Sequence, residues 1–193
     1  MLKRILAVFG LGSALLLAGC VNNSVFPPEE IAAARIETSD APFISLVTMI
    51  NENSGGGEHS ALLINGSQQI MYDPAGSFRH SRVLRSDDVM YGMTPGLVDY
   101  YNSYHARFGY YVKIQKLDIS LEQADALIIR AQAQGAVPKL TCAIATSDIL
   151  NDFPLFAHIN NTFLPGRVMR LFGQIDGVET TFVREDDIGQ NYN

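Results

Sequence analysis

The chain is short of cysteine, of basic side chains and of long apolar runs, and each shortage excludes a class of protein. Its 193 residues include two cysteines, Cys20 and Cys142, which excludes a framework of several disulfides. The 14 lysines and arginines are outnumbered by 20 aspartates and glutamates, so the protein has no electrostatic reason to bind nucleic acid. The apolar run at residues 5–17 is shorter than the roughly 20 residues of a membrane-spanning helix.

Several motifs of well-known chemistry are missing as well. The sequence has no phosphate-binding glycine loop and no Gly-x-Ser-x-Gly turn around a catalytic serine. No two of the four histidines have the spacing of a zinc site: His80 lies in a basic segment, His105 on the polar side of a predicted helix, and His158 in a predicted loop. We therefore expect neither a metal nor another cofactor.

The N-terminus has the features of an exported protein that is anchored by lipid. Lys3 and Arg4 precede the apolar run, and the sequence Leu-Ala-Gly-Cys, which ends at Cys20, follows it. This sequence resembles the bacterial lipoprotein box, which implies a signal peptide over residues 1–19 and acyl chains such as palmitate on Cys20. By the same resemblance, Val21 replaces the aspartate associated with inner-membrane retention, which implies the outer membrane on its periplasmic side.

Removal of the signal peptide changes the charge and leaves one free thiol. Without Lys3 and Arg4 the chain has 12 basic and 20 acidic side chains, a formal charge of −8. Because such a surface is not attracted to anionic head groups, we expect the membrane to be a partner only through the lipid on Cys20. Cys142 is then an unpaired thiol in an oxidising compartment, where a free cysteine is either buried or used chemically.

The mature sequence divides into a polar, proline-marked tether at residues 20–42 and one α+β domain at residues 43–193. Apolar runs and alternation predict strands at residues 43–50, 60–64, 68–72, 110–117 and 179–184. Periodicity and capping residues predict helices at residues 31–35, 97–108, 120–134 and 167–172, and one more that begins at residues 141–142. The intervening residues 77–96 are polar and predict an irregular covering segment.

One histidine stands at the start of a predicted strand. A glycine run at residues 55–57 leads to His59, and the Asn-Gly pair at residues 65–66 is typical of a two-residue hairpin turn. With that turn His59 faces Tyr72 on the returning strand, whereas a one-residue change in the loop sets Asp73 opposite His59. Asp73 is also well suited to a turn, so the register of the hairpin decides its role.

The remaining thiol stands at the start of a predicted helix. A thiol attacks as the thiolate, and an ordinary cysteine with a pKa of about 8.5 is mostly protonated at neutral pH. Thr141 is expected to cap the helix and to place Cys142 in its first turn, where free backbone N–H groups favour an anion. A neighbouring imidazolium would lower the pKa of the thiol further, and His59 is the candidate.

These two stretches together resemble one enzyme family. EHSALLI at residues 58–64, followed by TCAIA at residues 141–145, has the order of the circularly permuted papain-like enzymes, the NlpC-type branch that includes lecithin:retinol acyltransferase-like proteins. The resemblance covers residues 44–150, and the Cys-Ser-Gly and Asn-Cys-Glu-His versions of the nucleophile motif are both missing. It implies an α+β papain-like fold, in which a small antiparallel sheet that carries His59 packs against the helix of Cys142.

The resemblance also implies an activity, that of a cysteine-dependent amidase, peptidase or acyltransferase. Cys142 would attack an acyl carbon, His59 would take and return the proton, and a third polar group would orient His59. Asp73 is the first candidate for this group and Tyr72 the second. The compartment indicates a cell-wall peptide as the first substrate and an acyl lipid as the second. The alternative is a non-catalytic envelope lipoprotein, a binding or assembly module in which Cys142 is sealed under apolar side chains.

Overall fold

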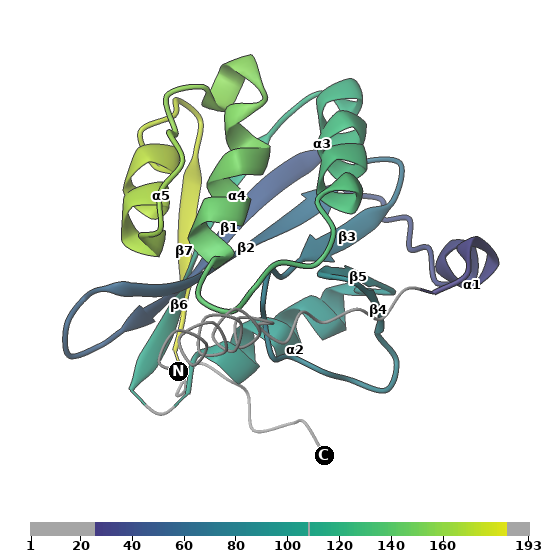
Figure 1. Ribbon diagram of the computed structural model, residues 1–193, viewed down its shortest axis with the longest axis horizontal. Helices are drawn as coiled ribbons and strands as arrows, with labels where there is room; N and C mark the ends of the chain where they lie inside the picture. The colour runs from purple at the N-terminus through teal and green to yellow at the C-terminus, as the bar shows by residue number, and fades with distance from the viewer. Residues whose placement is uncertain (1–25, 108, 185–193) are drawn as a thin grey trace, which may run out of the picture.

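The computed structural model describes residues 26–107 and 109–184. The predicted signal peptide and the lipidation site at Cys20 lie outside these residues. The described residues form a single antiparallel sheet with helices on both faces, which confirms the α+β class (Figure 1). The sheet has seven strands in the order β4-β5-β3-β2-β1-β6-β7, so it is larger than the small sheet that the resemblance implied.

The strands are short at one edge of the sheet and long at its centre. They are β1 (Phe43–Asn51), β2 (Gly57–Asn65), β3 (Gln69–Tyr72), β4 (Leu84–Ser86), β5 (Val89–Tyr91), β6 (Tyr110–Asp118) and β7 (Glu179–Val183). The helices are α1 (Pro28–Ala33), α2 (Pro95–His105), α3 (Leu121–Ala133), α4 (Cys142–Asn151) and α5 (Pro165–Phe172), with a 3₁₀ turn at Pro154–Phe156. Each predicted helix and strand therefore has a counterpart, with ends shifted by a few residues.

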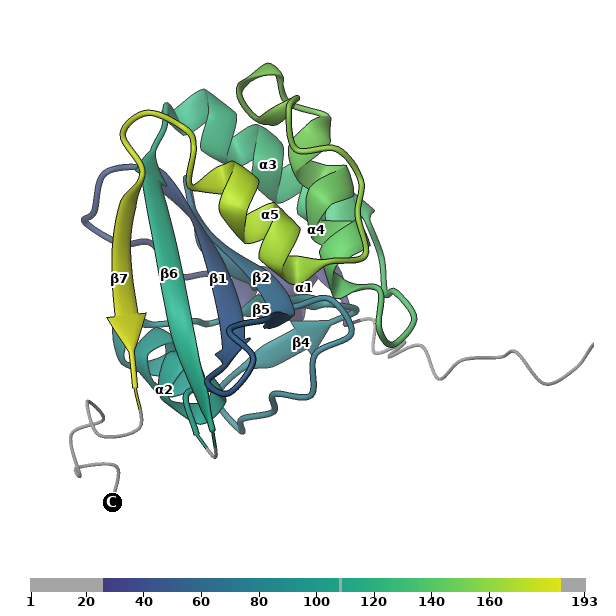
Figure 2. The same cartoon turned by 90° about the vertical axis from the view of Figure 1, so that its left-hand side faces the viewer.

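The central strand β1 separates two apolar cores. It pairs with β2 on one side and with β6 on the other. Ile44 and Leu46 belong to the core under α3, α4 and α5, whereas Phe43 and Val47 belong to the core under α2. Figure 2 shows these helices on opposite sides of the sheet. Because both faces are covered, β1 is apolar along most of its length, as the sequence predicted.

The helix α3 begins as its sequence predicts. The Ser120 Oγ accepts a hydrogen bond from the Gln123 N–H at 3.1 Å, and the Gln123 side chain accepts one from the Ser120 N–H at 3.0 Å. This reciprocal capping box satisfies two backbone donors that the helix itself leaves without a partner. It fixes where α3 starts on the sheet, and α4 packs beside it.

The hairpin between β2 and β3 is wider than predicted. Its loop contains the three residues 66–68 instead of two. The resulting register sets Tyr72 opposite Leu62. Both predicted registers, which placed Tyr72 or Asp73 opposite His59, are therefore wrong.

Contacts with the segment before β1 explain the wider turn. The Asn65 Oδ1 accepts a hydrogen bond from the Thr38 hydroxyl at 2.9 Å, and its Nδ2 donates to the Ala41 carbonyl at 3.2 Å. The Gln69 N–H donates to the Ile36 carbonyl at 2.8 Å. These bonds hold Asn65 in the sheet, so that the chain turns one residue later than the Asn-Gly pattern indicates. Part of the predicted tether thus lies against this hairpin.

The segment at residues 77–96 is more regular than predicted. It contains the two antiparallel strands β4 and β5, and β5 pairs with β3. Each has only three residues, too few for an alternating pattern to be recognised in the sequence. These strands extend the sheet at the edge where the candidate site lies.

Candidate active site

An incomplete strand ladder brings the predicted site residues together. Tyr72 makes the last pair between β3 and β2, so residues 57–61 of β2 continue past the end of β3. His59 lies on this part of β2, Asp73 directly follows β3, and Cys142 is the first residue of α4. All three side chains therefore meet at one end of the sheet.

A β-bulge lies beside the histidine. Met49 of β1 pairs with His59, whereas Ile50 pairs with Gly57, so Glu58 is an extra residue in β2. Successive side chains of a regular strand point to opposite faces. The bulge changes this alternation and lets Glu58 and His59 line the same pocket.

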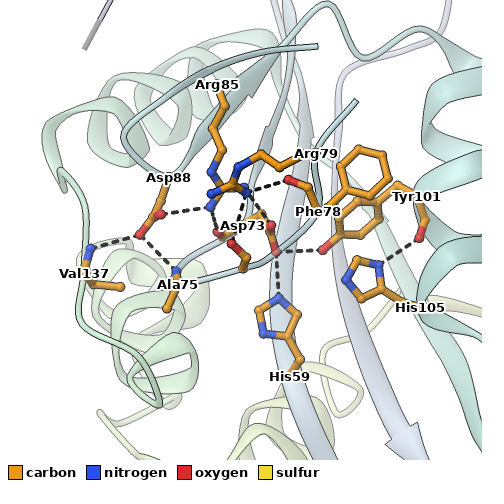
Figure 3. A network of polar contacts seen from close by, with 11 residues as sticks. His59, Asp73, Ala75, Phe78, Arg79, Arg85, Asp88, Tyr101, His105 and Val137 are labelled. Carbon is orange, nitrogen blue, oxygen red and sulfur yellow. Dashed lines mark hydrogen bonds and ion pairs between the residues drawn. The ribbon is translucent and has the colours of Figure 1, made fainter. Parts of the chain in front are cut away.

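His59 and Asp73 are joined by a short hydrogen bond. The His59 Nε2 lies 2.7 Å from the Asp73 Oδ1, with the Asp73 side chain fully buried and that of His59 14% exposed (Figure 3). Because Nε2 is occupied, Nδ1 is the ring nitrogen left to exchange a proton with Cys142. A Cβ at Gly76 would overlap the Asp73 carboxylate, so glycine is required at this position.

The carboxylate of Asp73 has two further side-chain donors. The Tyr101 hydroxyl donates to Oδ1 at 2.9 Å, and the Arg85 Nη1 donates to Oδ2 at 2.8 Å. Burial by itself raises the pKa of Asp73, but the hydrogen bond and charge of His59 and the charge of Arg85 outweigh burial and hold that pKa well below its usual range. Asp73 is therefore an anion that both orients His59 and favours its protonated form.

A second buried carboxylate connects two loops of the site. The Asp88 Oδ1 accepts from the Arg85 Nη2 at 2.9 Å. Its Oδ2 accepts from the N–H of Ala75, in the loop after β3, at 3.0 Å, and from that of Val137, in the loop before α4, at 2.9 Å (Figure 3). Arg85 thus links two carboxylates, and Asp88 fixes the loop that delivers the thiol relative to the loop that carries Asp73.

The thiol occupies the predicted place at the start of α4. The side chain of Cys142 is mostly buried, and its sulfur lies near the backbone N–H groups of Ser60 and Ala143, which help to lower its pKa. Thr141 occupies the predicted N-cap position, but its side chain does not cap the helix, because the Thr141 hydroxyl donates to the Pro138 carbonyl at 2.6 Å instead. The first turn of α4 therefore keeps its N–H groups for the sulfur and for a bound substrate.

The pKa values of the histidine and the thiol move in opposite directions. Burial lowers the pKa of His59, but its hydrogen bonds to Asp73 and Cys142 and their charges outweigh burial and raise this pKa to about 10. Burial raises the pKa of Cys142, but the hydrogen bond and charge of His59 and the two backbone donors lower it below its ordinary value. Both shifts favour a thiolate beside an imidazolium.

A second histidine stacks on the first. The rings of His105 and His59 are 5.9 Å apart at an angle of 12°. The His105 Nδ1 lies 2.8 Å from the Tyr101 carbonyl, which can only accept, so Nδ1 carries the proton. Burial lowers the pKa of His105 and favours its neutral form. The predicted place of His105 on the polar side of its helix is therefore wrong, because it covers the site.

A pocket of about 550 Å³ opens over the histidine and the thiol. Although Cys142 is only 8% exposed, it lies in the wall of this pocket and is not sealed beneath the core. The pocket wall is mostly apolar and aromatic, with Met49, Tyr104, Tyr110 and Leu140 among its members. Three charged side chains also line it, namely Glu58, Arg107 and Lys139.

The second candidate for orienting the histidine does not reach it. The ring of Tyr72 belongs to the core under α3, α4 and α5, and its hydroxyl has no hydrogen-bond partner among the described residues. His80 and His158 lie outside the pocket wall; the first accepts from the Arg82 N–H and the second contacts the Leu171 carbonyl. Asp73 is thus the partner that the structure gives to His59.

Four buried or half-buried side chains of the site were not predicted from the sequence. Arg85 and Asp88 belong to the short strands and the turn between them, in the segment predicted to be irregular. Tyr101 and His105 belong to a helix whose tyrosines indicated core packing alone. Nothing in one sequence assigns these residues to a site, because each acts through a partner distant along the chain.

Comparison with protein-family models, with curated proteins and with solved structures finds no match for this chain. Within residues 26–107 and 109–184, no three side chains of His, Cys, Asp or Glu are grouped so as to hold a metal ion. None of the helices in those residues has the length and apolar character needed to cross a membrane. Function is therefore inferred from the geometry of the pocket.

Proposed function

We propose that the protein is a cysteine-dependent hydrolase or acyltransferase that cleaves an amide or ester bond. One observation carries the proposal: Cys142 and His59 line the same open pocket, close enough for each to shift the pKa of the other, and the Nε2 of His59 is held by the buried Asp73. A histidine with a carboxylate behind it and a thiol in front is the arrangement that activates a cysteine nucleophile.

The reaction would proceed through a thioester. The Cys142 thiolate attacks the acyl carbon, and the carbonyl oxygen takes up the negative charge, for which the backbone N–H groups in the first turn of α4 are the nearest donors. As the intermediate collapses, His59 gives its proton to the departing amine or alcohol. Water, or a second alcohol or amine, then loses a proton to His59 and attacks the thioester, and Cys142 leaves as the thiolate.

The fold is consistent with the permuted papain-like architecture that the sequence resembles. A histidine on an antiparallel strand precedes a cysteine at the start of a helix that packs on the same sheet. We include in this proposal lipidation at Cys20 and a place on the periplasmic side of the outer membrane. With that location, peptides of the cell wall are the first substrate to test and acyl lipids the second.

The pH dependence of thiol alkylation tests the proposal. In the full chain carrying Cys20→Ser, Cys142 is the only thiol, and iodoacetamide should label it rapidly at pH values below the ordinary thiol pKa of about 8.5. His59→Ala should slow this labelling, because the imidazolium is lost. A chromogenic ester such as p-nitrophenyl acetate should leave an acetyl group on Cys142, detectable by mass spectrometry.

The opposite result identifies the alternative function. If Cys142 reacts only after the protein unfolds, the cysteine is structural, and the catalytic proposal is wrong. The envelope binding or assembly module would then be the better description. Circular dichroism of the two variants shows whether a change in labelling reflects the site or a loss of folding.

A further inference from the structure

The charges around the pocket differ in sign from those of the whole protein. Besides His59 and Cys142, whose opposite charges offset each other, three charged side chains line its wall: Arg107 and Lys139 are cations, and Glu58 is an anion. Outside the predicted signal peptide the chain has 12 basic and 20 acidic side chains. The wall that faces the thiol is thus locally cationic on an acidic protein.

Neither cation is neutralised by a carboxylate within the described residues. Arg107 donates a long hydrogen bond, 3.3 Å, to the Ser103 hydroxyl, and Lys139 forms no ion pair. Several other arginines of the fold do have such partners; Arg85 and Arg130, for instance, each bind two carboxylates. The charges of Arg107 and Lys139 are therefore available to a ligand.

Both cations line the pocket that contains the thiol, and they come from separate segments of the chain. Lys139 lies three residues before Cys142 in the loop leading to α4, and Arg107 follows α2, whose last residue is the His105 that covers His59. Glu58 enters the same wall because of the bulge in β2. An anionic group of a substrate at the thiol would therefore meet two positive side chains and one negative one.

We propose that the acyl substrate of this site carries a carboxylate close to the bond that is cleaved, and that Arg107 and Lys139 bind this carboxylate. The planar guanidinium of Arg107 offers two parallel donors to a carboxylate, and the Lys139 ammonium adds a compact charge. This inference rests on the proposed function, because it concerns the substrate of the same thiol. Glu58 opposes the carboxylate and limits the preference for an anion.

Two alkylating reagents of nearly equal size test the inference without a known substrate. Iodoacetate carries a carboxylate on the reacting carbon and iodoacetamide a neutral amide; with each, the sulfur forms a bond to that carbon and iodide leaves. The ratio of their rates at Cys142 measures the preference for the anion. Since both reagents attack the same thiolate, a change in the pKa of Cys142 cancels in the ratio.

The inference predicts the direction and the approximate size of the change in this rate ratio for each variant. A unit charge about 6 Å away in water changes a rate constant about threefold, so Lys139→Gln and Arg107→Gln should each lower the iodoacetate-to-iodoacetamide ratio by roughly this factor. Glu58→Gln should raise the ratio. Added salt should reduce all three effects, because it screens exposed charges.

Lys116→Gln is the matched control, since it removes the same charge from β6 about 20 Å along the strand from the pocket residue Tyr110. It should leave the ratio unchanged. If Lys139→Gln and Arg107→Gln behave like Lys116→Gln while iodoacetamide still labels Cys142 rapidly, the carboxylate inference is wrong and the catalytic proposal stands. If neither reagent labels the folded protein, both are wrong.

Discussion

The part of the chain that the structure describes contains two clusters in which one arginine binds two aspartates, and they differ mainly in burial. Arg85 lies 2.8 Å from Asp73 and 2.9 Å from Asp88, and all three side chains are at most 6% exposed. Arg130 lies 2.7 Å from Asp148 and 2.5 Å from Asp152, with side chains between 25% and 54% exposed. From the bond lengths alone, the two clusters would be expected to contribute equally to stability.

Burial separates what the two clusters do. Water around Arg130 and its partners screens their attraction and can replace any one of them, so the cluster adds little stability. The two aspartates bound to Arg85 are fully buried and shielded from bulk water, so these charges depend on one another. The buried cluster is also the one that holds His59 and the loop of Cys142. The comparison teaches that geometry identifies an ion pair, whereas burial decides its consequence.

Removal of the arginine from each cluster should give the largest difference in stability between them. Arg85→Met leaves two buried carboxylates without their cation, and the free energy of unfolding should fall by roughly 3–5 kcal/mol. Arg130→Met should lower it by less than about 1 kcal/mol, because its aspartates remain hydrated. Urea unfolding of both variants measures the difference. Similar losses in the two variants would show that burial is not the deciding factor.

The pH dependence of stability should reveal the charge pair that the buried cluster supports. In the unfolded chain His59 titrates near pH 6.5 and Cys142 near pH 9.0. In the folded protein the pKa of His59 is raised to about 10 and that of Cys142 is lowered. Above both pH 6.5 and the lowered pKa of Cys142, and up to pH 9.0, the pair therefore holds one proton in both states, on the imidazolium when folded and on the thiol when unfolded. Because the folded and unfolded states then bind equal numbers of protons, the pair does not make the free energy of unfolding depend on pH in this range.

The variant Cys142→Ala should remove this cancellation. In this variant Asp73 still raises the pKa of His59, whereas the share of the shift that Cys142 supplied is lost; what remains stabilises the fold fully below pH 6.5 and is lost as the pH rises through the folded pKa. Stability should fall above pH 6.5 by up to about 1.4 kcal/mol per pH unit, whereas the unaltered protein should stay level up to pH 9.0. Urea unfolding at several pH values measures both profiles. Parallel profiles would mean that no thiolate–imidazolium pair forms.

Neutralising one carboxylate in each cluster tests which cluster affects the reactivity of Cys142. Asp73→Asn removes the anion behind His59, so the pKa of Cys142 should rise and iodoacetamide labelling near neutral pH should slow by about tenfold for each unit of that rise. Asp148→Asn, in the exposed cluster, should leave the labelling profile unchanged. A profile for Asp73→Asn that matches that of Asp148→Asn would exclude an electrostatic role for Asp73.

The smallest effect is expected at the edge of the buried cluster. Tyr101→Phe removes one of three side-chain donors to Asp73 and leaves His59 and Arg85 in place. The free energy of unfolding should fall by about 1 kcal/mol, the usual net value of one hydrogen bond. Thermal or urea unfolding measures it. A loss of stability as large as that of Arg85→Met would mean that the Tyr101 hydroxyl stabilises the buried charges as strongly as the arginine does.

The sequence predicted the parts of this site that depend on local chemistry. The capping box of α3, the apolar run of β1 and the start of a helix at Cys142 each follow from residues close together in the chain. The choice of Asp73 over Tyr72 also agrees with the structure, although for another reason. The two residues were compared by hairpin register, whereas Asp73 reaches His59 because it lies just beyond the end of β3.

The parts that were not predicted depend on contacts between distant segments. Asn65 does not turn where an Asn-Gly pair normally turns, because bonds from residues 38–41 hold it in the sheet. Arg85 and Asp88 would be exposed charges if the loops around them were absent, and their sequence looks like a surface segment. His105 is set over His59 by the packing of α2 on the sheet, which periodicity alone does not describe.

The early end of β3 makes the sheet itself part of the chemistry. Pro74, which would stand opposite Ser60 in the register of this ladder, has no N–H for a further strand pair, and the Ser60 N–H lies where it helps to lower the pKa of Cys142. In this register Ser60 stands two pairs beyond the last pair, Leu62 with Tyr72, so a β3 that was longer by two pairs would compete with the thiol for this N–H. The length of one short strand therefore sets how many donors surround the thiol.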